Sequence, residues 1–241
     1  MRLTNNLYIM HYDQAGWIAN YVDHNAYWLH DGNPNRPHVR MRSGNHSNGF
    51  FNSRLVIEDG ALLRKAAEDL VDLLQLARFD INNIDRVVGP QTGATRLADY
   101  IADTIGQIRR RKCAWASPAK GEMKFGVPGP MKFHDPMRSS RSGEMTILCE
   151  DVMTTGGSAQ RAAVAVKEKG GILLPYVLVL VNRSGQEEID GRKIISLINT
   201  PMATWRMNDQ VKECPLCAAG SPLIVSVKDE WSQLTAKYEK V

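Results

Sequence analysis

Largely apolar strands that alternate with amphipathic helices constrain the fold of this 241-residue chain more than any other feature. The segments 145–151 and 172–185 are apolar at most positions before their polar ends. Strands of this kind are buried on both faces, which is typical of parallel sheets covered by helices. Together with strands expected at 84–90, 112–117 and 193–200, the pattern predicts an α/β fold with a mostly parallel central sheet flanked by helices.

Three helices are expected beside these strands, at 58–79, 95–108 and 158–171. Within the first, leucine and alanine recur at intervals of three and four from Leu62 to Ala77 and form one apolar face. Pro175 lies near the start of the 172–185 strand. Because proline lacks a backbone N–H, we expect sheet pairing to begin only after it.

The chain divides into three parts by composition and pattern. Residues 1–40 are polar and turn-rich and form an N-terminal extension or hood segment, residues 41–225 form the main domain, and residues 226–241 form a C-terminal helix. Within the main domain, residues 118–143 hold several prolines and glycines and show no sustained period. Such a stretch is typical of a mobile functional loop.

The charge balance and the hydropathy narrow the function classes. The 30 Lys and Arg against 26 Asp and Glu leave a net charge of +4, which is too small to indicate a nucleic-acid protein. No apolar run approaches the roughly 18 residues of a membrane span, and the first 17 residues lack the apolar core of a signal peptide. We therefore expect a cytoplasmic protein that binds neither nucleic acid nor membrane.

The four cysteines do not indicate a disulfide scaffold. Cys113 and Cys149 lie within apolar runs and are expected to be small buried hydrophobic residues. Cys214 and Cys217 form a single C-x-x-C pair. A structural zinc site needs four ligands, usually two such pairs or one pair with histidines. Since no second pair exists, the favoured interpretation is a tight turn that carries two thiols, with zinc binding and a redox role as alternatives.

Two adjacent acids, Glu150 and Asp151, end the strand of residues 145–151 and precede a loop of small residues, TTGGS. Ligands of parallel α/β sheets bind at the carboxyl ends of the strands. Glycines and a following helix N-terminus expose backbone N–H groups that suit a phosphate. The acids can accept hydrogen bonds from sugar hydroxyls or hold a hydrated Mg²⁺. The pattern therefore predicts a ribose 5-phosphate site, with solvated charges beside a plain turn as the alternative.

The stretch ILCEDVMTTGGS resembles the phosphoribosyl-diphosphate (PRPP) signature of the type I phosphoribosyltransferases. The resemblance implies the type I phosphoribosyltransferase fold over residues 41–225, with a mobile lid loop and a hood-like N-terminal segment. It implies that the two acids contact the ribose hydroxyls, with Mg²⁺ held mainly by PRPP near them. The PRPP-binding residues that it predicts are Glu150, Asp151, Val152, Met153, Thr154, Thr155, Gly156, Gly157 and Ser158, together with Thr92 and Gly93.

Further stretches are similar to bacterial orotate phosphoribosyltransferases. RSGNHSNGFFN resembles their N-terminal segment, VVGPQTGATRLA resembles their pyrophosphate loop, and ECPLCAAGSPL resembles their C-terminal motif. Gln91 and Ala94 stand where many relatives have an acid and a glycine. An arginine also ends the strand in LVNRSG. The orotate-binding residues implied by the resemblance are Arg42, Phe50, Phe51, Thr154 and Arg183. For either phenylalanine alone, packing in the core fits equally well.

The lid loop departs from the family pattern. Pro118 and Ala119 stand where charged residues are expected, and Lys120 and Lys124 are the early cations. Lys120 is the candidate for a catalytic contact with pyrophosphate, and a solvated loop lysine is the alternative.

The resemblance implies a pentosyltransferase reaction of pyrimidine biosynthesis. In it, the 5-phosphoribosyl group of PRPP moves to orotate and gives orotidine 5-phosphate and pyrophosphate, with Mg²⁺ as cofactor. Asp151, Glu150 and Lys120 are the implied catalytic residues, and a homodimer is the implied assembly. Two alternatives stay open: transfer to another nucleobase, and a PRPP-binding regulatory protein without turnover.

Overall fold

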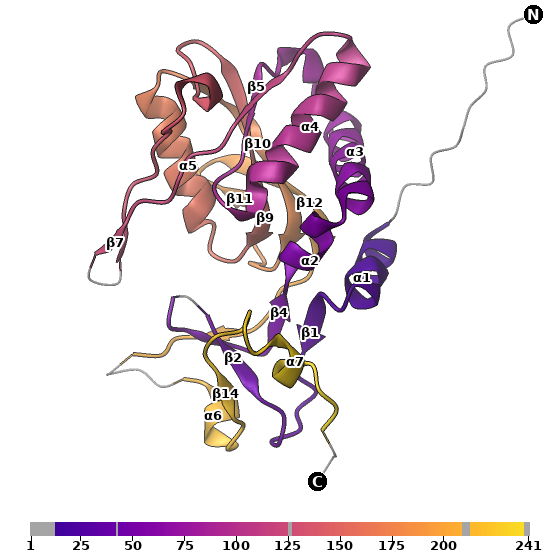
Figure 1. Cartoon of the computed structure of the whole chain (residues 1–241), viewed down its shortest axis with the longest axis vertical. Coiled ribbons are helices and arrows are strands. Elements are labelled where there is room, and N and C mark those ends of the chain that lie inside the picture. The colour runs from indigo at the N-terminus through magenta and orange to yellow at the C-terminus, as the bar shows by residue number, and fades with distance from the viewer. Residues whose placement is uncertain (1–12, 42, 125–126, 209–212, 239–241) are drawn as a thin grey trace, which may run out of the picture.

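The computed structural model describes residues 13–41, 43–124, 127–208 and 213–238. Figure 1 shows a larger lobe of sheet and helices, and a smaller lobe formed by segments from both ends of the chain. Within the described residues, no helix is long and apolar enough to cross a membrane.

The centre of the large lobe is a six-stranded sheet in the order β11-β12-β10-β9-β5-β6. All neighbouring pairs are parallel except β11 with β12. The predicted α/β fold with a mostly parallel sheet is therefore confirmed. The strands are β5 (Arg86–Val88), β6 (Ala114–Ala116), β9 (Met145–Met153), β10 (Ile172–Asn182), β11 (Glu188–Ile189) and β12 (Arg192–Asn199).

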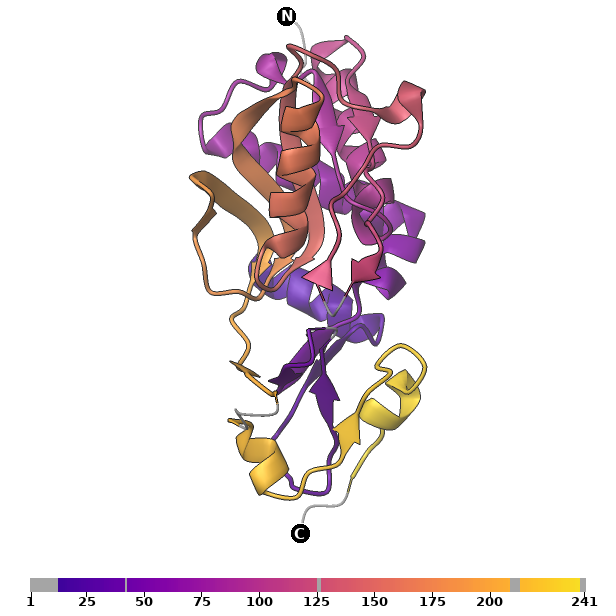
Figure 2. The ribbon, with the colours of Figure 1, turned by 90° about the vertical axis from the view of Figure 1, so that its left-hand side faces the viewer.

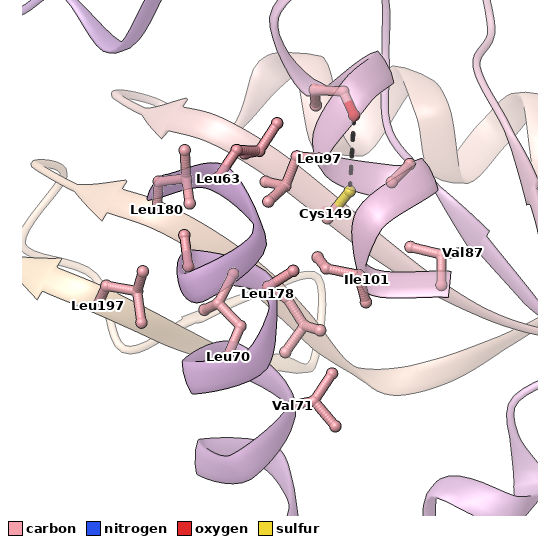
Figure 3. Close-up of a cluster of buried hydrophobic side chains, with 14 of the residues drawn as sticks. Leu63, Leu70, Val71, Val87, Leu97, Ile101, Cys149, Leu178, Leu180 and Leu197 are labelled. Atoms are coloured by element: carbon pink, nitrogen blue, oxygen red, sulfur yellow. Dashed lines mark hydrogen bonds between the residues drawn. The ribbon is translucent and has the colours of Figure 1, made fainter. Parts of the chain in front are cut away.

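Helices cover both faces of this sheet (Figure 1). On one face, leucines of α3 and α4 pack against Leu178, Leu180 and Leu197 of β10 and β12 (Figure 3). On the other face, alanines of α5 pack against Val177 and Val179 of β10. The helical segments of the large lobe are α1 (Gln14–Asp23), α2 (Ser53–Glu58), α3 (Gly60–Leu76), α4 (Gly93–Arg109), α5 (Gly157–Glu168) and the 3₁₀ turns η1 (Ile81–Asn83) and η2 (Pro136–Arg138).

Two cysteines belong to the core, as the sequence predicted. Cys113 and Cys149 are free thiols and are buried. Burial raises the pKa of Cys113 to about 11 and raises the pKa of Cys149 well above its ordinary value. Both side chains therefore act as small hydrophobic residues rather than as thiolates.

Three expectations about local structure are corrected. β10 already pairs with β9 at Ile172 and Leu173, and a register shift follows before Val177, so pairing does not wait for Pro175. The bulge accommodates the missing N–H of that proline. The C-terminal helix is only α7 (Trp231–Leu234) within the described residues. The loop 118–143 contains a two-stranded ribbon, β7 (Met123–Lys124) with β8 (Val127–Pro128), and a bridge between Ala119 and Lys132.

This ribbon and its flanking residues, 119–124 and 127–132, form an arm. In Figures 1 and 2 the arm extends from the large lobe toward the small lobe. It begins just after β6, at the same end of the sheet as the acids of β9. Its position is therefore that of the lid expected from the sequence.

The small lobe combines residues from both ends of the chain. Its four-stranded sheet has the order β13-β3-β2-β14, and β1 pairs with β4 beside it. A separate apolar cluster holds it together: Trp28, Val39, Ile224, Val227, Trp231 and Leu234. The elements are β1 (Tyr27–Leu29), β2 (His38–Arg40), β3 (His46–Ser47), β4 (Gly49–Phe51), β13 (Thr204–Trp205), α6 (Pro215–Ala218), β14 (Leu223–Ile224) and α7.

Candidate functional site

The loop of small residues joins the end of β9 to the start of α5. Gly156 has a φ of 76°, a left-handed conformation that favours glycine, and a Cβ there would overlap the side chain of Ile189. Thr154 and Thr155 are exposed, and Ser158 is half-buried in the first turn of α5. Free backbone N–H groups and three hydroxyls therefore meet at a helix N-terminus, which is an arrangement suited to a phosphate.

Val152 and Met153 differ from the other predicted PRPP-binding residues. Met153 is buried in the apolar cluster beneath α5, and Val152 packs against the cluster on the opposite face. The Met153 carbonyl accepts a hydrogen bond from the backbone N–H of Arg183 at 3.0 Å. Of the predicted PRPP-binding residues, these two can therefore offer a ligand little beyond their backbone.

The two acids lie in different environments. Glu150 is buried, and its Oε2 atom has no hydrogen-bond partner, whereas Asp151 is half-buried. Burial raises the pKa of Glu150 well above its ordinary value, the neighbouring Asp151 raises it further, and the positive charge of Lys120 opposes both effects. A buried carboxyl oxygen without a partner favours a hydroxyl donor or a cation at this position.

Asp151 also touches the predicted pyrophosphate loop. Gly93 begins α4, and a Cβ at this position would overlap the Asp151 carboxylate. Thr92 before it is exposed, and the Gln91–Thr92 peptide bond is cis. Beneath the loop, the Cys149 thiol lies 3.9 Å from the Ala94 carbonyl oxygen (Figure 3). The structure thus brings the 92–93 loop, predicted from a separate motif, directly against the acids.

Lys120 enters the site from the arm. It is exposed and follows Ala119, whose backbone forms both hydrogen bonds of the bridge to Lys132. The positive charge of Lys120 lowers the pKa of Glu150, so the two side chains interact electrostatically. Lys120 therefore stays a candidate cation for a ligand bound at the acids.

Arg161 is a cation beside residues 154–158, which we call the phosphate loop because their geometry suits a phosphate, and no sequence motif indicated it. Its Nη2 atom is 3.5 Å from the Ser158 hydroxyl, and a Cβ on Gly157 would lie 3.2 Å from its Nη1. Its Nε atom is buried without a hydrogen-bond partner. Helical spacing from Ser158 was the available signal, because residues three apart share a helix face.

The residues predicted to hold the base are dispersed. Arg42 lies outside the described residues. Phe51 is 3% exposed and packs against Tyr21 and Tyr27, with ring centroids 5.3 and 4.7 Å away, so it is a core residue and not an open wall for a pyrimidine. Phe50 is half-buried on the other face of β4 and lies 5.9 Å from the ring of Trp231. Strand alternation prevents both rings from lining one pocket.

Arg183 is buried where β10 ends. Its guanidinium donates to the Gly49 carbonyl oxygen at 2.9 Å and to the Ser47 hydroxyl at 2.5 Å, with Thr204 Oγ1 at 3.4 Å. Burial lowers the pKa of Arg183 to about 10. Within the described part of the chain, no carboxylate forms an ion pair with it. Arg183 therefore joins the small lobe to the sheet, as a buried cation without a carboxylate partner among the described residues.

The comparisons with known proteins agree with this architecture. The orotate phosphoribosyltransferase of Mycobacterium tuberculosis superposes with a TM-score of 0.55 at 22% identity, covering 78% of this chain and 96% of its own. That of Aeropyrum pernix superposes with a TM-score of 0.52 at 20% identity, covering 75% and 91%. The fold, with the acids and the phosphate loop at one end of its sheet, is the type I phosphoribosyltransferase fold.

The sequence comparison is more specific. The chain is 28% identical over 187 residues to the orotate phosphoribosyltransferase of Desulforamulus reducens, covering 78% of this chain and 86% of that protein. It is 29% identical over 199 residues to that of Acidithiobacillus ferrooxidans, covering 81% and 90%. No family model matches the chain. Its relatives in sequence are thus orotate phosphoribosyltransferases, as the motifs indicated.

Glu150→Gln is expected to stabilise the protein without ligands at pH 8 and to change its stability little at pH 5. Folding raises the pKa of Glu150, so above the ordinary carboxyl pKa the native state still holds a proton that the unfolded state has lost. The free energy of unfolding therefore falls as pH rises. Glutamine does not ionise, so the variant does not lose stability in this way. We expect a rise in Tm of several degrees at pH 8, measured by calorimetry.

The control is Glu168→Gln, at an exposed position at the end of α5. It should change Tm by less than about 1–2 degrees at either pH, as is usual for exposed substitutions. An equal change for Glu150→Gln at pH 5 and pH 8 would contradict the assignment of the raised pKa.

Proposed function

We propose that this protein transfers the 5-phosphoribosyl group of PRPP to orotate and releases orotidine 5-phosphate and pyrophosphate. The observation that carries the proposal is the contact between Asp151 and the 92–93 loop. Asp151 lies three residues before Thr154, where the phosphate loop begins. A ligand with a phosphate at one end and a pyrophosphate at the other would span these two loops across the acids. The relatives in sequence support orotate as the acceptor.

Each half of the site has a role in this reaction. The backbone N–H groups of the 154–158 loop would bind the 5-phosphate. Asp151 and Glu150 would accept hydrogen bonds from the ribose hydroxyls and stabilise positive charge that develops on the ribose as pyrophosphate leaves. Lys120 and the backbone at Thr92 and Gly93 would stabilise the negative charge of the departing pyrophosphate.

The donor atoms at the acids also suit Mg²⁺, which prefers carboxylate oxygens, phosphates and water as ligands. The Glu150 Oε2 atom lacks a hydrogen-bond partner, and Asp151 beside it is accessible. These two residues would hold the ion together with PRPP. When bound, Mg²⁺ neutralises charge on the pyrophosphate group.

Arg183 and Phe50 support orotate as the acceptor base. Arg183 is a buried cation with no carboxylate partner in the described part of the chain, so an anionic base such as orotate would supply the missing charge. Its present bonds to Ser47 and Gly49 would have to be exchanged for that contact. The half-buried Phe50 remains the candidate aromatic wall.

The test is orotate consumption by purified protein with PRPP and Mg²⁺, followed by absorbance. A panel of other nucleobases is run in parallel, with pyrophosphate release as the readout. Turnover with orotate supports the proposal. Pyrophosphate release with another base alone assigns a different acceptor, and PRPP binding by calorimetry without any turnover assigns a regulatory binding protein.

We also propose that the protein is cytoplasmic and acts as a homodimer, which is the assembly that its resemblance to the phosphoribosyltransferases implies. In a dimer, the arm would reach the neighbouring subunit's site. Light scattering after gel filtration measures the mass of the particle. A monomer with full activity would contradict the dimer.

Arg161→Gln is expected to raise the KM for PRPP about tenfold or more, because a hydrogen bond to a charged group contributes about 1.5–3 kcal/mol. The reason is the position of its guanidinium beside Ser158 and Gly157. Steady-state kinetics over a PRPP series measures the effect. Lys167→Gln, an exposed cation in the last turn of α5, is the matched control and should leave KM unchanged. An unchanged KM in the Arg161 variant would remove it from the phosphate site.

A further inference from the structure

Two histidines and two cysteines from distant parts of the chain meet in the small lobe. His38 lies in β2, His46 lies in β3, and Cys214 and Cys217 lie at the start and within the turn of α6. One donor atom from each residue lies within 4.8 Å of the other three. His38, His46 and Cys214 are buried, and Cys217 is exposed. The C-x-x-C pair thus has the two further partners that a four-ligand site requires.

The distances within this cluster suit a small tetrahedral site. His38 Nε2 is 3.1 Å from His46 Nδ1, and Cys217 Sγ is 3.3 and 3.2 Å from these two nitrogens. Zinc bonds of about 2.0–2.1 Å to nitrogen and about 2.3 Å to sulfur place tetrahedral donors about 3.3–3.8 Å apart. Small rotations of the four side chains would bring all of their donors to these separations.

The hydrogen bonds around His38 fix its orientation. Its Nδ1 atom is 2.9 Å from the Ser221 hydroxyl oxygen, and that hydroxyl donates to the Arg36 carbonyl oxygen at 2.6 Å. With its own proton engaged, the Ser221 oxygen accepts the Nδ1–H of His38. The Nε2 lone pair then faces the cluster. This outer hydrogen bond on the second ring nitrogen is typical of histidines that bind metals.

We propose that His38, His46, Cys214 and Cys217 form a structural zinc site. Two thiolates and two imidazoles are the donors that zinc prefers, and Mg²⁺ or Ca²⁺ would require oxygen ligands. Four protein ligands leave no open position for substrate, so the role is structural. The exposed Cys217 provides the path by which the ion enters.

The position of the site explains what the ion would stabilise. Among the described residues, the buried apolar cluster of the small lobe has only six members, and its strands come from both ends of the chain. An ion bound by β2, β3 and α6 would hold the 214–217 segment against the 38–46 hairpin. None of the four residues belongs to the phosphate loop or to the acids, so zinc binding and the proposed reaction are tested separately.

The first experiment measures zinc by mass spectrometry in protein purified under reducing conditions, after incubation with Zn²⁺ alone and removal of the excess. We expect about one zinc ion per chain. Cys217→Ser and His46→Asn should each lose most of it. Cys113→Ser is the matched control, because Cys113 is a buried free thiol in the large lobe, and it should keep the full amount. Zinc retained by both cluster variants, or absent from the wild-type protein, would overturn the proposal.

A second experiment needs only the wild-type protein and therefore remains decisive if the variants do not fold. X-ray absorption at the zinc edge should show two sulfur ligands at about 2.3 Å and two nitrogen ligands at about 2.0–2.1 Å. A chelator should lower the Tm of the zinc-bound protein, and added Zn²⁺ should restore it. A shell of oxygen ligands, or a Tm that the chelator does not change, would contradict a structural zinc site.

Discussion

Asp151→Asn is expected to lower kcat/KM for orotate and PRPP about 10²–10³-fold, a loss typical of removing one electrostatic group that stabilises a transition state. Asparagine has nearly the same shape, so the contact with Gly93 is kept while the negative charge beside the ribose is lost. The measurement is the initial rate of orotate consumption in the wild-type protein and in the variant.

Circular dichroism and Tm distinguish loss of charge from loss of fold. Because asparagine has nearly the shape of aspartate and Asp151 is only half-buried, Tm should stay close to the wild-type value. Glu168→Gln, the exposed acid at the end of α5, should keep wild-type activity. A fully active Asp151→Asn variant would show that the acids do not serve the reaction.

Gly93→Ala is expected to lower kcat/KM by about 10²-fold while the fold is kept, because a displacement of about 1 Å at reacting groups can cost this much. The added Cβ would overlap the Asp151 carboxylate, so either the carboxylate or the 92–93 loop must move. Gly93 opens α4, where alanine is otherwise well tolerated. Steady-state kinetics measure the change in kcat/KM, and calorimetry measures the change in PRPP binding.

The control for this prediction is the same substitution within the same helix. At Gly106, a Cβ would meet its nearest neighbour at 3.5 Å, an ordinary contact. Gly106→Ala should leave activity unchanged and stabilise the protein by up to about 1 kcal/mol through helix propensity. Equal activity losses in both variants would mean that the effect of Gly93→Ala comes from the helix rather than from Asp151.

The phosphate loop and the acids were predictable because they are contiguous. Residues 150–158 follow one path from strand through turn to helix, and residue types along such a path determine its local geometry. The central sheet was predictable for a related reason, since runs of apolar residues indicate burial on both faces. The C-terminal helix was predicted too long, and the ribbon of the arm was missed, because polar segments carry weak periodicity.

The residues predicted to bind the base show where local sequence pattern does not predict the contacts of a side chain. Phe50 and Phe51 look equivalent in sequence, yet strand alternation sends Phe51 into the core against Tyr21 and leaves Phe50 beside Trp231. Arg183 matches a motif, but its guanidinium reaches Ser47 and Gly49, more than 130 residues away. Which partner a buried side chain meets depends on packing between elements.

By itself, the sequence determined the α/β class and predicted a ribose 5-phosphate site, because both depend on short contiguous stretches. Only the tertiary structure placed Gly93 against Asp151 and brought His38 and His46 to the C-x-x-C pair. These contacts join segments that are tens to more than a hundred residues apart. Their geometry is set by how strands and helices pack around the core, and no spacing along the chain records it.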